Sequence, residues 1–336
     1  MSLLADPEHR LARWLALQAG AESVSITDTK LLAGGAIQQN WKLAVLVSGG
    51  PHDGAQDWVL RTDAQAVLSH SHSRLEEFSL LRAAWDAQVP VPEPLFACES
   101  EGVLARPFFV MRLVRGITAG LQIVRSETLA GGREALAAQL GGILARIHTI
   151  RPGHAGLGFL PPPGARPMRE AIADLRARID VDAQPRPVFE WGLRHLEHLN
   201  PASGDIVLCH NDFRTGNFMI SERAVEAVLD WEFARWGDKL ADIGWFCARC
   251  WRFGSPHEAG GIGSREAFYR AYEAESGRKI EHALVAPWEL FAAIRWGVIA
   301  SEQADRHISG REHNLELALT GQVIPDLEQD ILELVA

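Results

Sequence analysis

The first third of the chain consists of short apolar runs separated by turn-forming residues. Alternating or short apolar runs occupy residues 25–32, 41–47 and 58–61. Gly34-Gly35 and Gly49-Gly50-Pro51 separate them, as expected for turns between strands. Before them, Asp6-Pro7-Glu8 has the features of a helix start. We therefore expect an amphipathic helix that runs to Gly20, followed by three antiparallel strands.

The spacing of apolar positions becomes helical over residues 68–85. Val89-Pro90-Val91-Pro92 ends that helix, because proline lacks an N–H donor and disfavours helix in the residue before it. Two more strands are expected over residues 95–98 and 108–114. This order of elements predicts an α+β domain over residues 1–114, with a five-stranded antiparallel sheet.

After Gly116 the pattern is mainly helical, which predicts a larger helical domain over residues 115–336. A buried helix is expected over residues 134–148, and long helices are expected over 265–276, 286–304 and 312–335. The exception is a region of short strands around turns at residues 206–209, 218–220 and 225–229.

Composition limits the class of protein. The 336 residues are 47% hydrophobic and 23% charged, which is ordinary for a globular enzyme, and the net charge of −10 argues against nucleic-acid binding. Residues 1–10 lack the basic-then-apolar pattern of a secretion signal, and Glu289 and Arg295 interrupt the longest apolar segment, residues 288–300. We therefore expect a cytoplasmic protein that is not inserted in a membrane. Cys247 and Cys250 lack a second metal-binding pair and are interpreted as packing residues.

The segment with the clearest chemistry is His210-Asn-Asp212-Phe-Arg-Thr-Gly-Asn217, followed by Asp230-Trp231-Glu232. Two carboxylates and a carboxamide at this spacing suit phosphoryl transfer, in which an Asp orients or deprotonates a hydroxyl and two oxygen ligands hold Mg²⁺. Asp212 is the predicted base, and Asn217 and Asp230 are the predicted metal ligands. His210 is expected to brace the loop. Ordinary turn chemistry is the alternative for each residue taken alone.

These two segments, with Gly237-Asp238-x3-Asp242 after them, resemble the aminoglycoside phosphotransferase-type (phosphotransferase enzyme) family. The resemblance extends over about residues 25–300 and is closest to a bacterial group that is also found fused to some acyl-CoA dehydrogenases. It implies a bilobal protein-kinase-like fold, with a small antiparallel-sheet N-lobe and a larger, mainly helical C-lobe. It also implies ATP as phosphate donor, with GTP as the alternative, and Mg²⁺.

The resemblance also implies a nucleotide site in the first domain. Gly34 and Gly35 match the turn that covers the phosphates, where glycine allows close backbone approach. Arg61 matches the lysine that binds the phosphates in kinases, and Glu77 matches its helix partner, with Glu76 as the rival. A charge on the strand surface is the alternative for Arg61.

Met111, Arg112 and Val114 match the segment that joins the lobes, where backbone groups of Arg112 and Val114 would bind adenine. Asp242 matches an Asp with a hydrogen-bonding role near the catalytic loop. Asn211 departs from the usual Gly after the histidine, and this is a mild change because Asn tolerates unusual backbone angles.

The predicted function is ATP-dependent phosphorylation of a hydroxyl on a small molecule. The alternative is a non-catalytic nucleotide-binding regulatory protein of the same fold, although Asp212, Asn217 and Asp230 are all present. Protein substrates are disfavoured, because the motif that anchors an activation segment is missing. Tryptophans cluster after Asp230, namely Trp231, Trp236, Trp245 and Trp251. They are either core residues or, if one or two line the site, an indication of an apolar or aromatic substrate.

Overall fold

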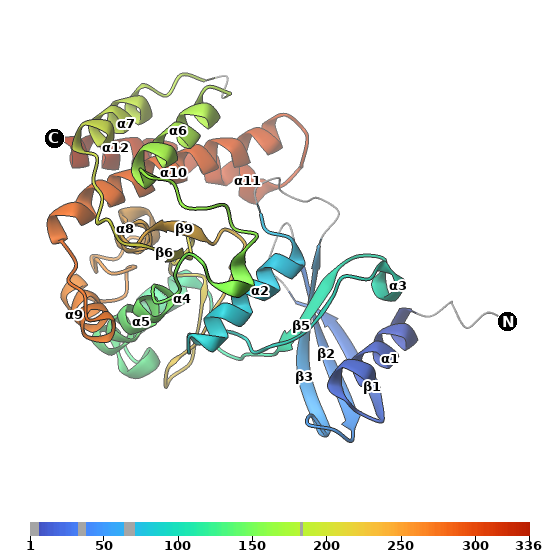
Figure 1. Ribbon diagram of the computed structural model, residues 1–336. Coiled ribbons are helices and arrows are strands. Elements are labelled where there is room, and N and C mark those ends of the chain that lie inside the picture. Colours follow the sequence, from blue (N-terminus) through green and yellow to red (C-terminus); the bar gives the residue numbers. More distant parts are fainter. Residues whose placement is uncertain (1–6, 33–37, 64–70, 182–183) are drawn as a thin grey trace. The chain divides into compact units, whose positions relative to one another are not determined.

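The computed structural model describes residues 7–32, 38–63, 71–181 and 184–336. Its contacts divide the chain into two compact units (Figure 1). The first unit holds residues 1–115, 155–159 and 226–233, and the second holds residues 116–154, 160–225 and 234–336. Two short segments from later in the sequence, residues 155–159 and 226–233, therefore fold with the first unit. The second of these segments contains Asp230 and Glu232.

A five-stranded antiparallel sheet forms the centre of the first unit (Figure 1). Its strands are β1 (Ser23–Leu31), β2 (Gln38–Ser48), β3 (Gly54–Asp63), β4 (Pro94–Cys98) and β5 (Phe108–Arg112), in the order β1-β2-β3-β5-β4. Gly49 and Gly50 turn the chain between β2 and β3 with φ of 76° and 77°. A side chain at Gly50 would also collide with the Gly20 carbonyl oxygen at 2.6 Å, so glycine is required there. The five predicted strands are thus all present.

Helices cover both faces of this sheet. α1 (Pro7–Ala19) packs Leu15 into a core that contains Phe108 and Val110 of β5. Phe109, between them, contacts Phe78 of α2 (Arg74–Asp86) at a centroid distance of 5.9 Å. Because side chains alternate along a strand, α1 and α2 lie on opposite faces.

Two boundaries in this unit differ from the sequence prediction. The helix expected from residue 68 begins at Arg74, because Ser73 caps it and Glu76 completes a capping box; residues 64–70 lie outside the described part. The strand expected to reach residue 114 ends at Arg112. A short helix that the sequence analysis did not predict, α3 (Glu101–Leu104), lies between β4 and β5.

The second unit is mainly helical. Its helices are α4 (Gly120–Arg125), α5 (Arg133–Ile147), α6 (Pro167–Ile179), α7 (Pro187–Leu199), α8 (Leu240–Cys247), α9 (Arg265–Ser276), α10 (His282–Ile308), α11 (Leu315–Thr320) and α12 (Ile324–Val335). The single helix predicted over residues 312–335 is wrong. The chain forms a 3-10 turn at Gly321–Val323, and Pro325 then lies in the first turn of α12, where proline is tolerated.

Short strands position the loops of the second unit. β6 (Ile206–Cys209) pairs with β9 (Arg235–Asp238), a strand that the sequence analysis did not predict. β7 (Phe218–Ile220) is followed by a turn, which Ser221 and Ala224 close, and then by β8 (Val225–Val228). The loop that carries Asp212 and Asn217 therefore connects β6 and β7.

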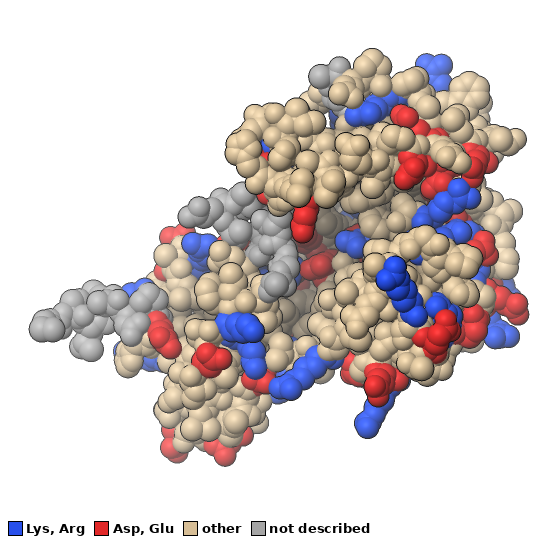
Figure 2. All heavy atoms as spheres, turned by 180° about the vertical axis from the view of Figure 1, so that it is seen from behind, with Lys and Arg blue, Asp and Glu red and all other residues tan. Residues whose placement is uncertain are grey.

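α10 is the one helix in the described part of the chain that is long and apolar enough to cross a membrane by length and composition. Its side chains Trp288, Leu290 and Ile294 are almost completely buried, and the helix contacts α7, α8 and α12. This packing is that of the central helix of a folded unit. Acidic and basic side chains are interspersed over the face shown in Figure 2.

Candidate functional site

In the first unit, Arg61 of β3 forms a buried, two-pronged ion pair with Glu77 of α2. Arg61 Nη2 lies 2.8 Å from Glu77 Oε1, and Arg61 Nε donates to Glu77 Oε2 at 3.1 Å. The pair forms because Arg61 lies on the face of β3 that α2 covers. Glu76, the rival partner, accepts the Ser73 N–H in the helix cap instead. Arg74 also contacts Glu77, and its Nε lies 2.9 Å from Asp63 Oδ1.

Asp230, the predicted anionic metal ligand, folds against this ion pair. Its Oδ1 accepts from Arg61 at 3.4 Å, and its side chain is 42% exposed. The backbone of Asp230 has φ of 59°, a conformation that non-glycine residues adopt rarely and that clusters at functional sites. Because Arg61 engages Oδ1, Oδ2 is the carboxylate oxygen that remains to bind a hard cation.

The charged side chains around Arg61 shift one another's pKa values. Burial alone would lower the pKa of Arg61, but the charges of Glu77, Asp230 and Glu232 outweigh it and raise the pKa above its ordinary value. Burial, together with the charges of Asp230 and Glu77, raises the pKa of Glu232 to about 7. Arg61 therefore remains a cation in this acidic surrounding.

The segment predicted to bind adenine lies at the end of β5. The Arg112 N–H donates to the Glu93 carbonyl at 2.9 Å, and its side chain binds Glu93 and Gln56. The Arg112 N–H is therefore not available to an adenine ring. Of the two backbone groups of Arg112 that were predicted to bind adenine, only the carbonyl could do so. Met111 pairs with Val59 and Pro94 inside the sheet, and Val114 follows β5. Gly34 and Gly35 lie outside the described residues.

In the second unit, Asp242 of α8 holds the start of the loop that leaves β6. Its two oxygens accept the backbone N–H groups of His210 and Asn211, each at 2.7 Å. Asn211 has φ of 61°, which Asn adopts more readily than most residues. His210 is fully buried and its Nδ1 accepts the Asp212 N–H at 3.2 Å, so its side chain braces the loop.

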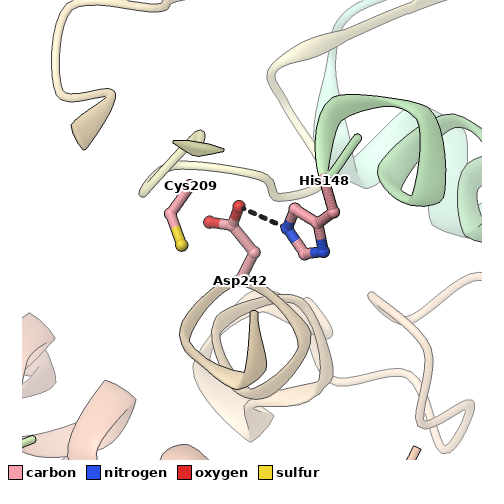
Figure 3. Close-up of side chains that lie close together, drawn as sticks. All are labelled: His148, Cys209 and Asp242. Atoms are coloured by element: carbon pink, nitrogen blue, oxygen red, sulfur yellow. Dashed lines mark hydrogen bonds and ion pairs between the residues drawn. The ribbon is translucent and has the colours of Figure 1, made fainter. Parts of the chain in front are cut away.

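His148, Cys209 and Asp242 place a nitrogen, a sulfur and an oxygen within 4.8 Å of one another (Figure 3). Each group already has a protein partner. His148 Nε2 lies 3.2 Å from Asp242, His148 Nδ1 lies 2.8 Å from the Tyr272 hydroxyl, and Cys209 Sγ donates to the Asp238 carbonyl at 3.3 Å.

The cluster in Figure 3 is thus satisfied by hydrogen bonds without a metal ion. Burial alone would raise the pKa of Asp242, but the hydrogen bond and charge of His148 and the contacts from His210 keep that pKa below its ordinary value. Asp242 is therefore an ionised anchor for the loop.

Three donors hold the carboxylate of Asp212. Arg214 Nε and Trp245 Nε1 both donate to Oδ1, at 3.0 and 3.1 Å, and Asn217 Nδ2 donates to Oδ2 at 2.5 Å. The side chain is 14% exposed. These bonds fix the orientation of the carboxylate, as positioning of a reacting hydroxyl requires.

Asn217 is buried at the end of the same loop. Its Nδ2 also donates to the Asp212 backbone carbonyl at 3.0 Å, which fixes the orientation of the amide. Oδ1 is therefore the amide atom that remains to bind a cation, and a neutral oxygen is a suitable Mg²⁺ ligand.

Three further side chains lie near Asp212, namely Arg214, Trp245 and Arg295. Of these, only Trp245 was considered from the sequence, as a core residue or one that lines the site. The Arg214 guanidinium lies 4.5 Å from the Trp251 ring centroid, and that of Arg295 lies 4.3 Å from the Trp245 ring centroid. The tryptophans in question, Trp231, Trp236, Trp245 and Trp251, are all at most 9% exposed. Their burial favours core packing and not an apolar substrate surface.

A family model described as the phosphotransferase enzyme family matches residues 28–287. The match takes in most of the chain, and the chain belongs to this family. The predicted family and protein-kinase-like fold are thereby confirmed, and a small-molecule phosphotransferase is supported.

Two solved structures share the fold. A provisionally named aminoglycoside phosphotransferase from Ralstonia eutropha JMP134 is 22% identical, with a TM-score of 0.77 and coverage of 97% of both chains. A spectinomycin phosphotransferase in complex with ADP and spectinomycin is 13% identical, with a TM-score of 0.62 and coverage of 97% of this chain and 98% of that chain.

The sequence relatives are longer proteins. Human acyl-CoA dehydrogenase family member 11 is 26% identical over 306 residues, which are 84% of this chain. This chain spans 17% to 37% of the length of acyl-CoA dehydrogenase family members 10 and 11 from mouse, chicken and human.

Proposed function

We propose that this protein transfers the γ-phosphate of ATP to a hydroxyl group of a small molecule, with Asp212 as the base or orienting group. The observation that carries the proposal is the carboxylate of Asp212, which Arg214, Trp245 and Asn217 hold in one orientation. Protein catalysis of phosphoryl transfer consists mainly of positioning and electrostatic stabilisation. Family membership and the ADP complex of the spectinomycin phosphotransferase support the same reaction.

Asn217 and Asp230 would hold Mg²⁺ through Asn217 Oδ1 and Asp230 Oδ2. The donor set fits, because both atoms are hard oxygens and the remaining polar atoms of these side chains have protein partners. When bound, Mg²⁺ supplies positive charge to the phosphate oxygens.

Arg61 would bind a phosphate group of the nucleotide. Glu77 engages its Nε and Nη2, so the orientation of the guanidinium is set by a buried partner. A guanidinium offers five N–H groups, and one that neither Glu77 nor Asp230 uses could reach an anion. The backbone of Gly34, Gly35, Met111, Arg112 and Val114 would complete the nucleotide site.

The test measures nucleoside diphosphate formation by purified protein with Mg-ATP or Mg-GTP and a panel of alcohols. The panel contains amino sugars, choline-like amines, nucleoside-like sugars, macrolides and hydroxy acids. At least one alcohol should accelerate ADP formation and become phosphorylated. Asp212→Asn should lower the rate by about 10²–10⁴-fold, the range for a positioned base. Asp174→Asn, an exposed carboxylate in α6, is the matched control.

Full activity of Asp212→Asn would refute the role of Asp212. Nucleotide binding without phosphorylation of any alcohol in the panel would instead support the non-catalytic regulatory alternative.

A further inference from the structure

Two arginines of the second unit lie near Asp212 without a carboxylate partner. Arg295 projects from α10, is half-buried, and stacks on Trp245. Arg235 begins β9 and is exposed, and the strand register places it directly opposite Cys209, the last residue before the Asp212 loop. In the described part of the chain, neither guanidinium has a hydrogen bond or an ion pair to a carboxylate.

The chain carries a net charge of −10, yet neither of these two guanidinium groups is paired with a carboxylate. Arg178, a further cation near Arg295, forms a two-pronged pair with Glu302 at 2.7 Å. Asp212 and Asp242 attract Arg295, but the hydrogen bonds to their oxygens come from other donors. Burial, followed by the positive charge of Arg235, lowers the pKa of Arg295 to about 10. Folding thus brings two like charges together without neutralising either one.

Keeping a half-buried guanidinium unpaired costs free energy, because the group loses hydration without gaining an ion pair. Such a cost is often found at functional sites, where a ligand supplies the missing charge. The position of Arg295 suggests which ligand. The Trp245 indole donates its N–H to Asp212 and holds Arg295 against its ring, so one side chain connects the predicted reacting group with the unpaired cation.

We infer that Arg295 and Arg235 bind an oxyanion, a carboxylate or a phosphate, on the alcohol that Asp212 orients. This inference rests on the proposed function and names the class of its substrate. The Arg295 guanidinium lies 4.3 Å from the Trp245 ring centroid, and the N–H groups of a guanidinium match the two oxygens of a carboxylate or phosphate. Polycationic alcohols such as aminoglycosides would be repelled by the same two charges.

The first test measures binding without turnover. Thermal unfolding of the protein is followed with two matched pairs of probes, 3-hydroxybutyrate against 3-hydroxybutyramide and glycerol 3-phosphate against glycerol. Only a carboxylate or phosphate should raise the unfolding temperature, and the pair that responds identifies which oxyanion is recognised. The rise should persist in Asp212→Asn, which removes catalysis and leaves both arginines. Equal shifts with an acid and its neutral partner, or no shift with any probe, would overturn the inference.

The second test uses Arg295→Gln and Arg235→Gln, with Arg223→Gln as a control of equal charge change. Arg223 is exposed on the turn after β7, and within the described ranges its hydrogen bond is made by its backbone N–H. Arg235 is also exposed, so its variant should fold even if Arg295→Gln does not. Each variant should lose the acid-specific rise in unfolding temperature, whereas the control should retain it.

In kinetics, loss of one charge-assisted contact should raise KM for the anionic alcohol by roughly tenfold or more, with a smaller change in kcat. An increase confined to KM for ATP would overturn the inference and leave the phosphotransferase proposal intact. If no alcohol is phosphorylated, the proposed function fails. The acid-specific rise in unfolding temperature, and its loss in the two arginine variants, still decide whether the oxyanion site exists.

Discussion

Two consecutive glycines in α5 should respond to alanine with opposite signs. Gly141 faces α9, and a Cβ there would overlap the carbonyl oxygen of Phe268 and lie 3.1 Å from Tyr272 N. Gly142 faces open space, with nothing within 4 Å of an added Cβ. The two substitutions make the same chemical change one residue apart, so they differ only in what the new methyl group meets.

The magnitudes follow from these contacts. Alanine in a helix interior is more stable than glycine by about 0.5–1 kcal/mol, which is the expected gain for Gly142→Ala. Gly141→Ala has the same gain in helix propensity, but its methyl group forces the backbone of α9 away. Overpacking of this kind costs about 1–3 kcal/mol, and we expect the upper end because the displaced atoms are backbone atoms. The two variants should therefore differ in stability by about 1–3 kcal/mol.

Urea unfolding followed by circular dichroism measures the difference. Because a protein with two units need not unfold in one step, hydrogen exchange of the α5 amides should report the second unit separately. Displacement of α9 should also weaken the bond between His148 and Tyr272, now 2.8 Å long. Equal stability of the two variants, or a loss at Gly142 alone, would refute this account of the α5–α9 contact.

Three further substitutions test the site. Asp242→Asn should destabilise the second unit by about 3–5 kcal/mol near neutral pH, because it removes the charged partner of a buried cluster. The pKa of Asp242 is lowered on folding from 3.8, so its contribution is complete above that value and is lost as pH falls through the folded-state pKa. Urea midpoints should therefore converge in acid. Arg61→Lys keeps the charge but loses the two-pronged bond, and KM for ATP should rise by about tenfold. Arg214→Lys removes the Nε–H that Asp212 accepts, and kcat should fall by about tenfold with KM for ATP nearly unchanged.

Asp174→Asn is the control for Asp242→Asn. Asp174→Asn should leave stability within about 0.5 kcal/mol of wild type at any pH, as exposed pairs contribute little. Stability of Asp242→Asn equal to that of Asp174→Asn near neutral pH would contradict the anchor role. For the kinetic variants, a coupled assay of ADP formation is used. If Arg61→Lys changes only kcat, Arg61 does not bind the nucleotide as proposed. If Arg214→Lys changes only KM for ATP, Arg214 does not position Asp212 for the reaction.

The predictions that succeeded concern contacts within one loop or between two elements that follow each other in the sequence. Arg61 and Glu77 were matched through the resemblance to the family, and their pair joins a strand to the helix that follows it in the sequence. The Asp212–Asn217 spacing lies within a single loop, so its local geometry was also accessible. β9 was not predicted, because its four residues include Gly237 and show no alternation of apolar and polar side chains.

The surroundings of Asp212 could not be predicted for a different reason. Trp245 and Arg295 come from α8 and α10, and only tertiary packing brings them to the loop. The sequence showed a group of tryptophans without indicating which faces were buried. The break between α11 and α12 was missed because a continuous apolar pattern conceals the 3-10 turn at Gly321–Val323.

The central claim is transfer of a phosphate group to an alcohol, and mass spectrometry of the alcohol after incubation with γ-¹⁸O-labelled ATP and Mg²⁺ tests it most directly. The account predicts a phosphorylated alcohol that carries the label, formed by the wild-type protein and by Asp174→Asn but not by Asp212→Asn. Label that appears only in inorganic phosphate, with every alcohol unchanged, would contradict it.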